Sequence, residues 1–217
     1  MPSPRAGPGI LLLPVGREGL VSHPNARAII LAQLYELATR YGKIPYLWID
    51  MKCWAPSNLS TQEIYDELKT LQPNCMVIFN QHIQDGKKIT YFPTDVLNGE
   101  VTLPPESGHI AIRKIGGKNY YLPFEYEPVS QGRAASGESC WFTYGEGKKF
   151  TPSHPFPPEA VAKRIRLAWE RGAANVLLAT APDHSGKMRA EDVEQLRQIG
   201  RILRYEIPTV PKPNVQK

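Results

Sequence analysis

Polar and acidic residues stand at the ends of several apolar stretches in this sequence. The stretch YLWI runs into Asp50 and CMVIF runs into Asn80, while Glu100 and Glu125 follow in a less regular region. A carboxylate that ends a buried strand can cap the next helix, bind a metal ion or take part in catalysis. These acids are therefore the first candidates for chemistry.

Asp50 fits two of these three roles poorly. The next predicted helix begins at Ser60, which supplies its own cap. The other side chains that could share a metal ion with it, His82 and Asp95, have no recognised ligand spacing, so we expect no metal site. On this reasoning, catalysis and a structural hydrogen-bonding role both stay open for Asp50.

Aromatic residues lie on or beside the same segment ends. They are Tyr46, Trp48, Trp54 and Trp141. Aromatic faces bind the apolar side of a sugar ring, while neighbouring polar groups fix its hydroxyls. Paired carboxylates with aromatic residues suit glycoside hydrolysis, in which retaining enzymes hold a nucleophile and a separate acid/base about 5–5.5 Å apart. Each aromatic residue taken alone could equally belong to the core.

The composition disfavours several other classes of protein. The chain has 217 residues, enough for one sizeable domain, and its 26 basic residues are interleaved with 21 acidic ones, which argues against nucleic-acid binding. Three cysteines without paired spacing indicate neither a disulfide framework nor a zinc site. The run ILLL near the start is too short for a membrane span, and no targeting signal is recognised. We expect no cofactor.

Apolar strands alternate with amphipathic helices along the chain. Residues 1–9 are expected to be disordered, 10–205 to form one domain, and 206–217 to form an extended tail. The predicted order is strand 10–15, helix 22–41, strand 44–50, helix 60–72, strand 75–80, an irregular region 81–137 with hairpin strands near 88–92 and 109–122, strand 139–144, helix 157–172, strand 175–180 and helix 188–204. This alternation indicates an α/β fold with a parallel sheet, whose chemistry lies at the carboxyl ends of the strands.

The spacing of apolar residues predicts which face of each helix is buried. Ser60 with Glu63 forms a capping box at the start of the second helix. The predicted inward residues of the first helix are Ala26, Ile30, Leu34, Leu37 and Tyr41, and those of the last helix are Val193, Leu196, Ile199 and Leu203.

Four longer motifs occur in order between about residues 28 and 204. They are QLYELATRYGKIPYLWIDM, LQPNCMVIFN, SCWFTYGEGKKF and NVLLATAPDHSGKMRAEDVEQLRQIGRIL. Together they resemble α-L-fucosidases of glycoside hydrolase family 29, for example in the pattern Q-L-x-E-L-x-x-x-Y-G-x-I-x-x-L-W-x-D. The resemblance implies a partial (β/α)8 barrel, roughly its second half, and a retaining hydrolysis of terminal α-L-fucosyl residues on glycans or glycosides.

The resemblance also assigns roles to individual residues. It implies that Asp50 is the nucleophile, that Trp48 and Tyr46 line the sugar site, and that Trp141 packs against the methyl group of the sugar. His82 stands where the family often has an arginine near the substrate, and a loop-stabilising histidine is the alternative interpretation.

The acid/base residue is less clearly marked than the nucleophile. The family uses a glutamate downstream of the nucleophile, and Glu100 in FPTDVLNGEVTLPP resembles that segment. Glu125 in YYLPFEYEPVS is the competitor and resembles a second family glutamate, while Glu127 is the third choice. The resemblance therefore favours Glu100, with Glu125 as the catalytic alternative.

The length before Asp50 departs from the family pattern. The family's nucleophile follows the fourth strand of an eight-stranded barrel, whereas only 49 residues precede Asp50 here. The sequence thus predicts either a truncated fucosidase-like enzyme or a non-catalytic remnant that binds a glycan or partner. Open barrel edges would favour self-association. No membrane partner is expected, and the compartment stays unknown, since family members are often secreted, periplasmic or lysosomal.

Overall fold

The computed structural model describes most of the chain as two compact units. The described residues are 10–12, 23–50, 52, 55–82, 84–133, 153–180, 182 and 186–204. The first unit comprises Met1–Glu127 with Ala168–Leu177, and the second comprises Pro128–Leu167 with Leu178–Lys217. The main sheet lies wholly in the first unit.

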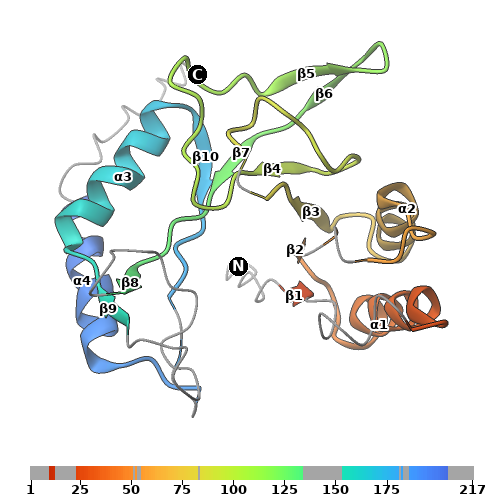
Figure 1. Cartoon of the computed structure of the whole chain (residues 1–217), viewed down its shortest axis with the longest axis horizontal. Coiled ribbons are helices and arrows are strands. Elements are labelled where there is room, and N and C mark those ends of the chain that lie inside the picture. The colour runs from red at the N-terminus through yellow and green to blue at the C-terminus, as the bar shows by residue number, and fades with distance from the viewer. Residues whose placement is uncertain are drawn as a thin grey trace, which may run out of the picture. The chain divides into compact units, whose positions relative to one another are not determined.

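Six parallel strands form the main sheet (Figure 1). In spatial order they are β1 (Ile10–Leu12), β2 (Tyr46–Ile49), β3 (Met76–Asn80), β4 (Val96–Asn98), β7 (Phe124–Tyr126) and β10 (Ala173–Val176). Every neighbouring pair is parallel. The connections β1–β2, β2–β3 and β7–β10 contain the helices α1 (Ala26–Arg40), α2 (Thr61–Leu71) and α3 (Pro158–Glu170) in turn. The predicted α/β fold with a parallel sheet is confirmed.

Helices α1 (Ala26–Arg40) and α2 (Thr61–Leu71) pack against one face of β2 and β3. The cluster that joins them includes Ile30, Leu34, Leu47, Ile49, Ile64, Leu68, Val77 and Phe79. The start of α2 is as predicted, because the Ser60 hydroxyl accepts a hydrogen bond from the Glu63 N–H at 3.1 Å. The inward position predicted for Tyr41 is wrong, since it follows the end of α1 and is 62% exposed.

The glutamine of the LQP motif closes the end of α1. The Gln72 amide nitrogen donates to the Ala38 carbonyl at 2.6 Å and to the Gly42 carbonyl at 2.8 Å, and its amide oxygen accepts from the Ile44 N–H at 3.4 Å. The last carbonyls of a helix lack partners within the helix, and Gln72 supplies them. One side chain therefore fixes the turn that leads into β2.

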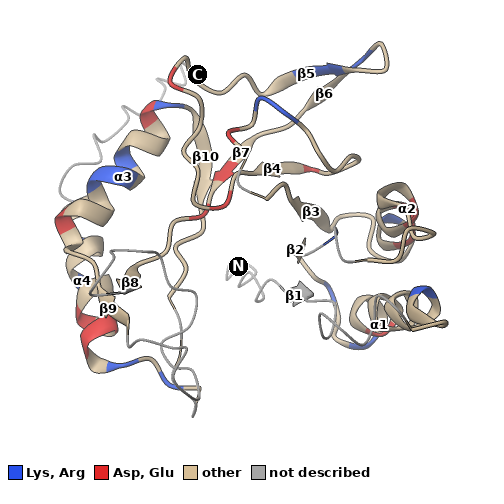
Figure 2. Cartoon of the chain, in the orientation of Figure 1, with Lys and Arg blue, Asp and Glu red and all other residues tan. Residues whose placement is uncertain are grey.

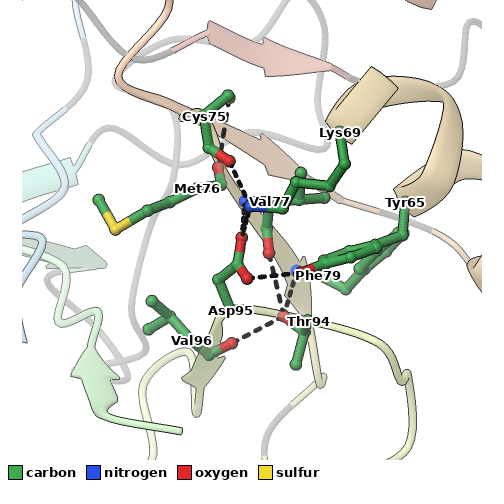
Figure 3. A network of polar contacts seen from close by, with 9 residues as sticks. All are labelled: Tyr65, Lys69, Cys75, Met76, Val77, Phe79, Thr94, Asp95 and Val96. Carbon is green, nitrogen blue, oxygen red and sulfur yellow. Dashed lines mark hydrogen bonds and ion pairs between the residues drawn. The ribbon is translucent and has the colours of Figure 1, made fainter. Parts of the chain in front are cut away.

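A polar network ties α2 to β3 and to the segment before β4 (Figure 3). Asp95 accepts hydrogen bonds from the Tyr65 hydroxyl and from the Val77 N–H, each at 2.7 Å, and pairs with Lys69 at 2.6 Å. Lys69 also donates to the Cys75 carbonyl at 2.7 Å. Burial, followed by the hydrogen bond to Asp95, raises the pKa of Tyr65, so its hydroxyl stays a donor. This network fixes the amino-terminal ends of β3 and β4, opposite the carboxyl ends where the candidate acids lie.

Two central strands, β4 and β7, lie in the region that the sequence predicted to be irregular. Each has only three residues, too few for an apolar run to stand out. The hairpin predicted within 109–122 is confirmed as β5 (Ile112–Ile115) and β6 (Lys118–Tyr121). The strand predicted near 88–92 is wrong: the N–H groups of Thr90 and Tyr91 donate to the buried Gln81 side chain instead of to another strand.

The second unit contains a short sheet and most of two helices. β8 (Gln131–Arg133) pairs antiparallel with β9 (Ser153–Pro155), and the helices are α3 (Pro158–Glu170), whose last residues belong to the first unit, and α4 (Ala190–Arg204). The strand predicted at 139–144 lies outside the described residues. In the first unit, the strand predicted at 175–180 is found slightly earlier, at Ala173–Val176.

The buried face of α4 differs from the predicted apolar stripe. Ile199 is buried as expected, but Asp192 and Gln195 are also buried, whereas Val193 and Leu196 are only partly so. The Gln195 amide donates to the carbonyls of residues 130 and 156 at 2.6 and 2.7 Å, which compensates for its burial. No helix in the described ranges is long and apolar enough to cross a membrane.

Candidate functional site

One face of the main sheet presents a short apolar layer followed by a polar one. The apolar layer comprises Trp48, Ile78 and Val96, with Tyr46 and Leu177 packed against it. Strand residues two apart point to the same side, so the next positions toward the carboxyl ends share this face. They are Asp50, Asn80, Asn98 and Glu125. The register confirms the alignment, because Asn80 lies opposite Asn98, and Asn98 lies opposite Glu125.

Asp50 directly follows β2 and is held by an asparagine from β3. The Asn80 amide nitrogen donates to the Asp50 carboxylate at 3.0 Å, and the Asn80 amide oxygen accepts from the His82 N–H at 2.9 Å. Asn80 is only 1% exposed, so its side chain has little freedom. The Asp50 carboxylate is therefore oriented by a buried neighbour rather than by solvent.

Glu125 on β7 is a buried carboxylate with three donors. The indole N–H of Trp48 donates to its Oε1 at 3.1 Å, the Asn98 amide donates to Oε1 at 3.0 Å, and the Asn175 amide donates to Oε2 at 2.6 Å. The side chain is 4% exposed. Such a group is a fixed hydrogen-bond acceptor, and it locks the Trp48 ring in place.

Glu100 lies two residues beyond β4 in an unusual backbone conformation. Its φ is 53°, in the left-handed region, and its N–H donates to the Asn98 side-chain oxygen at 2.7 Å. The preceding Gly99 is closely surrounded: a Cβ there would lie 2.4 Å from the Phe124 ring. The tight turn brings the Glu100 carbonyl to within 3.0 Å of the Glu127 N–H, which donates to it.

Glu127 completes the set of acids and has the most perturbed pKa among them. The pKa of its carboxyl group is raised to about 8: burial is the largest cause, the charges of Glu100, Glu125 and Asp50 act in the same direction, and a hydrogen bond from Asn98 acts in the opposite one. The side chain is 8% exposed. Figure 2 shows the acidic positions on and after β7. Four carboxyl groups thus converge here, and this environment favours the protonated form of Glu127.

The structure places the other predicted site residues less centrally. Tyr46 lies one step deeper than Trp48 on the same face, within the apolar layer. His82 follows β3 with a φ of 53°, and its ring packs edge-on against Tyr91 at 5.8 Å between centroids. Trp141 lies outside the described residues. Trp48, Asp50, Glu100 and Glu125 are the predicted residues that meet in one hydrogen-bonded or electrostatically coupled group.

Two asparagines that organise this group were missed by the sequence reasoning. The Asn98 amide donates to the Glu125 and Glu127 carboxyl groups, and its oxygen accepts from the Glu100 N–H. Asn175 on β10 donates to Glu125. The signal for Asn98 was present, since VLN repeats the apolar-to-asparagine ending of VIFN. In the part of the chain that the structure describes, no three His, Cys, Asp or Glu side chains are grouped to hold a metal ion.

Solved structures of similar fold include α-L-fucosidases. For α-L-fucosidase isoenzyme 1 from Paenibacillus thiaminolyticus, the TM-score is 0.55 at 18% identity, over 84% of this chain and 39% of that one. For α-L-fucosidase AlfC from Lactobacillus casei in complex with α-L-fucose, it is 0.50 at 19% identity, over 81% and 44%. For SpGH29, it is 0.64 at 18% identity, over 89% and 44%. No protein-family model and no curated protein match the sequence.

These comparisons establish the fold and its extent. The chain has the α/β fold of part of an α-L-fucosidase barrel, and it spans less than half of each of these structures. The resemblance predicted from the sequence is therefore confirmed for the fold.

Proposed function

We propose that this chain acts on α-L-fucosides as a retaining glycoside hydrolase, with Asp50 as nucleophile and Glu100 as acid/base. The observation that carries the proposal is the shared location of these two acids: both Asp50 and Glu100 act electrostatically on the same buried Glu127 carboxyl group. Asp50 follows β2 and Glu100 follows β4, with β3 between them, and a retaining glycosidase requires two such carboxyl groups at the carboxyl ends of its strands. The fold shared with α-L-fucosidases, one of them holding α-L-fucose, supports the choice of sugar.

The reaction needs one nucleophile and one proton carrier. A carboxylate oxygen of Asp50 attacks the anomeric carbon while the bond to the leaving oxygen breaks, and Glu100 gives its proton to that oxygen. In the second step, the oxygen of a water molecule attacks the anomeric carbon while Glu100 takes a proton from that water. The bond between the anomeric carbon and Asp50 breaks. The Asn80 amide, which donates to Asp50, would keep the attacking oxygen in position through both steps.

Glu100 is a better choice than Glu125 for the acid/base because of their hydrogen bonds. Glu125 accepts three hydrogen bonds, which favour its ionised form over the protonated form that an acid needs. Its proposed role is to position Trp48, whose ring would form one wall of the sugar site. Tyr46, His82 and Trp141 are proposed as further substrate contacts on the strength of the sequence resemblance.

The test is release of nitrophenol from 4-nitrophenyl α-L-fucoside by the full chain. The parent chain and Asp66→Ala, an exposed acid on α2, should both turn over substrate, whereas Asp50→Ala should lose at least about a thousandfold in rate. Added azide should partly restore the rate of Asp50→Ala, because the azide ion can replace the missing carboxylate nucleophile. The expected product is fucosyl azide. Equal rates for the parent chain and Asp50→Ala would refute the proposal.

A second candidate, a non-catalytic glycan-binding module, is favoured by the extent of the match. The chain covers 39% to 44% of the fucosidase structures, so residues from the remainder of such a barrel are not supplied by it. This candidate predicts binding of L-fucose without turnover of the nitrophenyl fucoside. Calorimetric titration with L-fucose, run beside the turnover assay, distinguishes the two.

A further inference from the structure

The Glu127 carboxyl group has no part in the proposed reaction. Among the described residues it is the buried acid with an oxygen that has no hydrogen-bond partner. Its side chain is 8% exposed, and its Oε2 atom is buried without a hydrogen-bond partner among the described residues. A buried polar oxygen without a partner costs stability, so its presence calls for an explanation.

The charges around Glu127 are all of one sign. Asp50 acts on it from the end of β2, Glu100 from the turn after β4, and Glu125 from β7, which ends just before Glu127. The Asn98 side chain is the polar neighbour that acts on it through a hydrogen bond. Burial, together with the negative charge that these neighbours carry when ionised, disfavours a charge on Glu127 and favours its protonated form.

A protonated carboxyl group is a hydrogen-bond donor as well as an acceptor. The proton on Glu127 requires an acceptor oxygen, and a bound ligand with a hydroxyl or ring oxygen would provide one. The surrounding carboxylates in turn are acceptors that suit the donors of several hydroxyl groups. The arrangement fits a neutral polyhydroxylated molecule, and it would repel a sugar that carries a carboxylate, sulfate or phosphate.

We propose that Glu127 is a further ligand-binding residue of this acidic site, and that its Oε2 carries a proton and donates it in a hydrogen bond to an oxygen of a neutral sugar. The choice of L-fucose as that sugar rests on the proposed function. No bond to the ligand forms or breaks at Glu127, and the proton stays on the carboxyl group throughout binding. The role is therefore distinct from that of a group that transfers a proton to the leaving oxygen.

The first measurement needs no ligand. Carbon-13 NMR of the carboxyl groups of the full chain should show one signal with a titration midpoint near pH 8, and this signal should be absent from Glu127→Gln. The matched control is Glu106→Gln, because the Glu106 side chain is 90% exposed. This control should retain the signal. A midpoint for Glu127 below pH 6 would overturn the proposal.

The second measurement is calorimetric titration with L-fucose at pH 6 and pH 9. The affinity of the parent chain and of Glu106→Gln should fall about tenfold between these values, because the Glu127 proton is lost across this interval. Glu127→Gln keeps a neutral donor at this position, so its affinity should change less than about twofold. A parent chain that binds L-fucose equally at both pH values would overturn the role of Glu127.

The two measurements together separate the two ways of failing. A midpoint near pH 8 with no binding of L-fucose at either pH refutes both the fucoside site and the ligand role of Glu127. Binding and turnover that are retained while Glu127 titrates in the ordinary acidic range refute the role of Glu127 alone. Far-ultraviolet circular dichroism of each variant establishes that the loss of a signal does not reflect unfolding.

Discussion

Replacing Glu127 with Gln should stabilise the fold progressively as the pH rises from 5 to 8. The pKa of this carboxyl group is 4.5 ordinarily and about 8 in the fold, raised first by burial and then by Glu100, Glu125 and Asp50. Because the folded pKa is the higher one, the native chain keeps a proton that the unfolded chain releases in this window. The stability contributed by the group is complete below about pH 4.5 and is lost as the pH rises toward 8.

The magnitude follows from the width of that window. Each pH unit inside it costs the parent chain about 1.4 kcal/mol in the free energy of unfolding, so pH 5 to 8 costs about 3 to 4 kcal/mol. Glu127→Gln cannot ionise at this position. The difference in unfolding free energy between the variant and the parent chain should therefore grow by this amount. Urea unfolding followed by tryptophan fluorescence at pH 5 and pH 8 measures it directly.

The control for this experiment is a glutamate with a solvent-exposed side chain. Glu106→Gln removes a carboxyl group whose side chain is 90% exposed, and it should shift the unfolding free energy by less than about 0.5 kcal/mol at either pH. If the difference between Glu127→Gln and the parent chain is the same at pH 5 and pH 8, the native state does not retain a proton at Glu127. That result would refute the electrostatic account of the site.

Two further substitutions test the packing that positions the acids. Gly99→Ala would place a Cβ 2.4 Å from the Phe124 ring and should cost about 1 to 3 kcal/mol in thermal unfolding. Gly200→Ala on α4 has open space and should be neutral or slightly stabilising, so an equal loss in both variants would contradict the steric argument. Asp95→Ala removes the acceptor shared by three donors and should cost about 2 to 4 kcal/mol in urea unfolding. Asp66→Ala, an exposed change on α2, should cost less than about 0.5 kcal/mol, and a similar loss in both aspartate variants would show that the network contributes little.

The sequence predicted the regular alternation of the fold because the long elements carry strong local signals. The cap at Ser60 and the apolar runs of β2 and β3 depend on neighbours within a few residues, and all three agree with the structure, although the Glu63 carboxylate pairs with Arg27. β4 and β7 have three residues each and acquire their strand conformation from the strands on either side. Such pairing depends on the whole sheet, so no local pattern could reveal it.

The candidate site likewise has one part that the sequence predicted and one part that it did not. Trp48 belongs to a continuous strand whose end was visible in the sequence and Asp50 directly follows it, and the structure places both on the same face of the sheet. The environment of Glu127 could not be predicted, since its pKa depends on acids that lie 2, 27 and 77 positions away in the sequence. Burial is the largest cause of the raised pKa of Glu127, and the spacing of residues in the sequence does not show how deeply a side chain is buried.

Glu125 on β7 and Glu127, which follows this strand, show that neighbouring groups rather than residue type determine the role of each acid in the site. Glu125 and Glu127 are two positions apart, so they share a face, and both are at least nine-tenths buried. Glu125 receives three N–H donors from β2, β4 and β10, which favours a carboxylate that accepts. Glu127, just past the strand end, receives Asn98 and three negative charges, which favours a carboxyl group that donates. Asn98 donates to both groups, so exchanging its amide for a carboxylate would raise the pKa of both and would favour a proton on Glu125 as well as on Glu127.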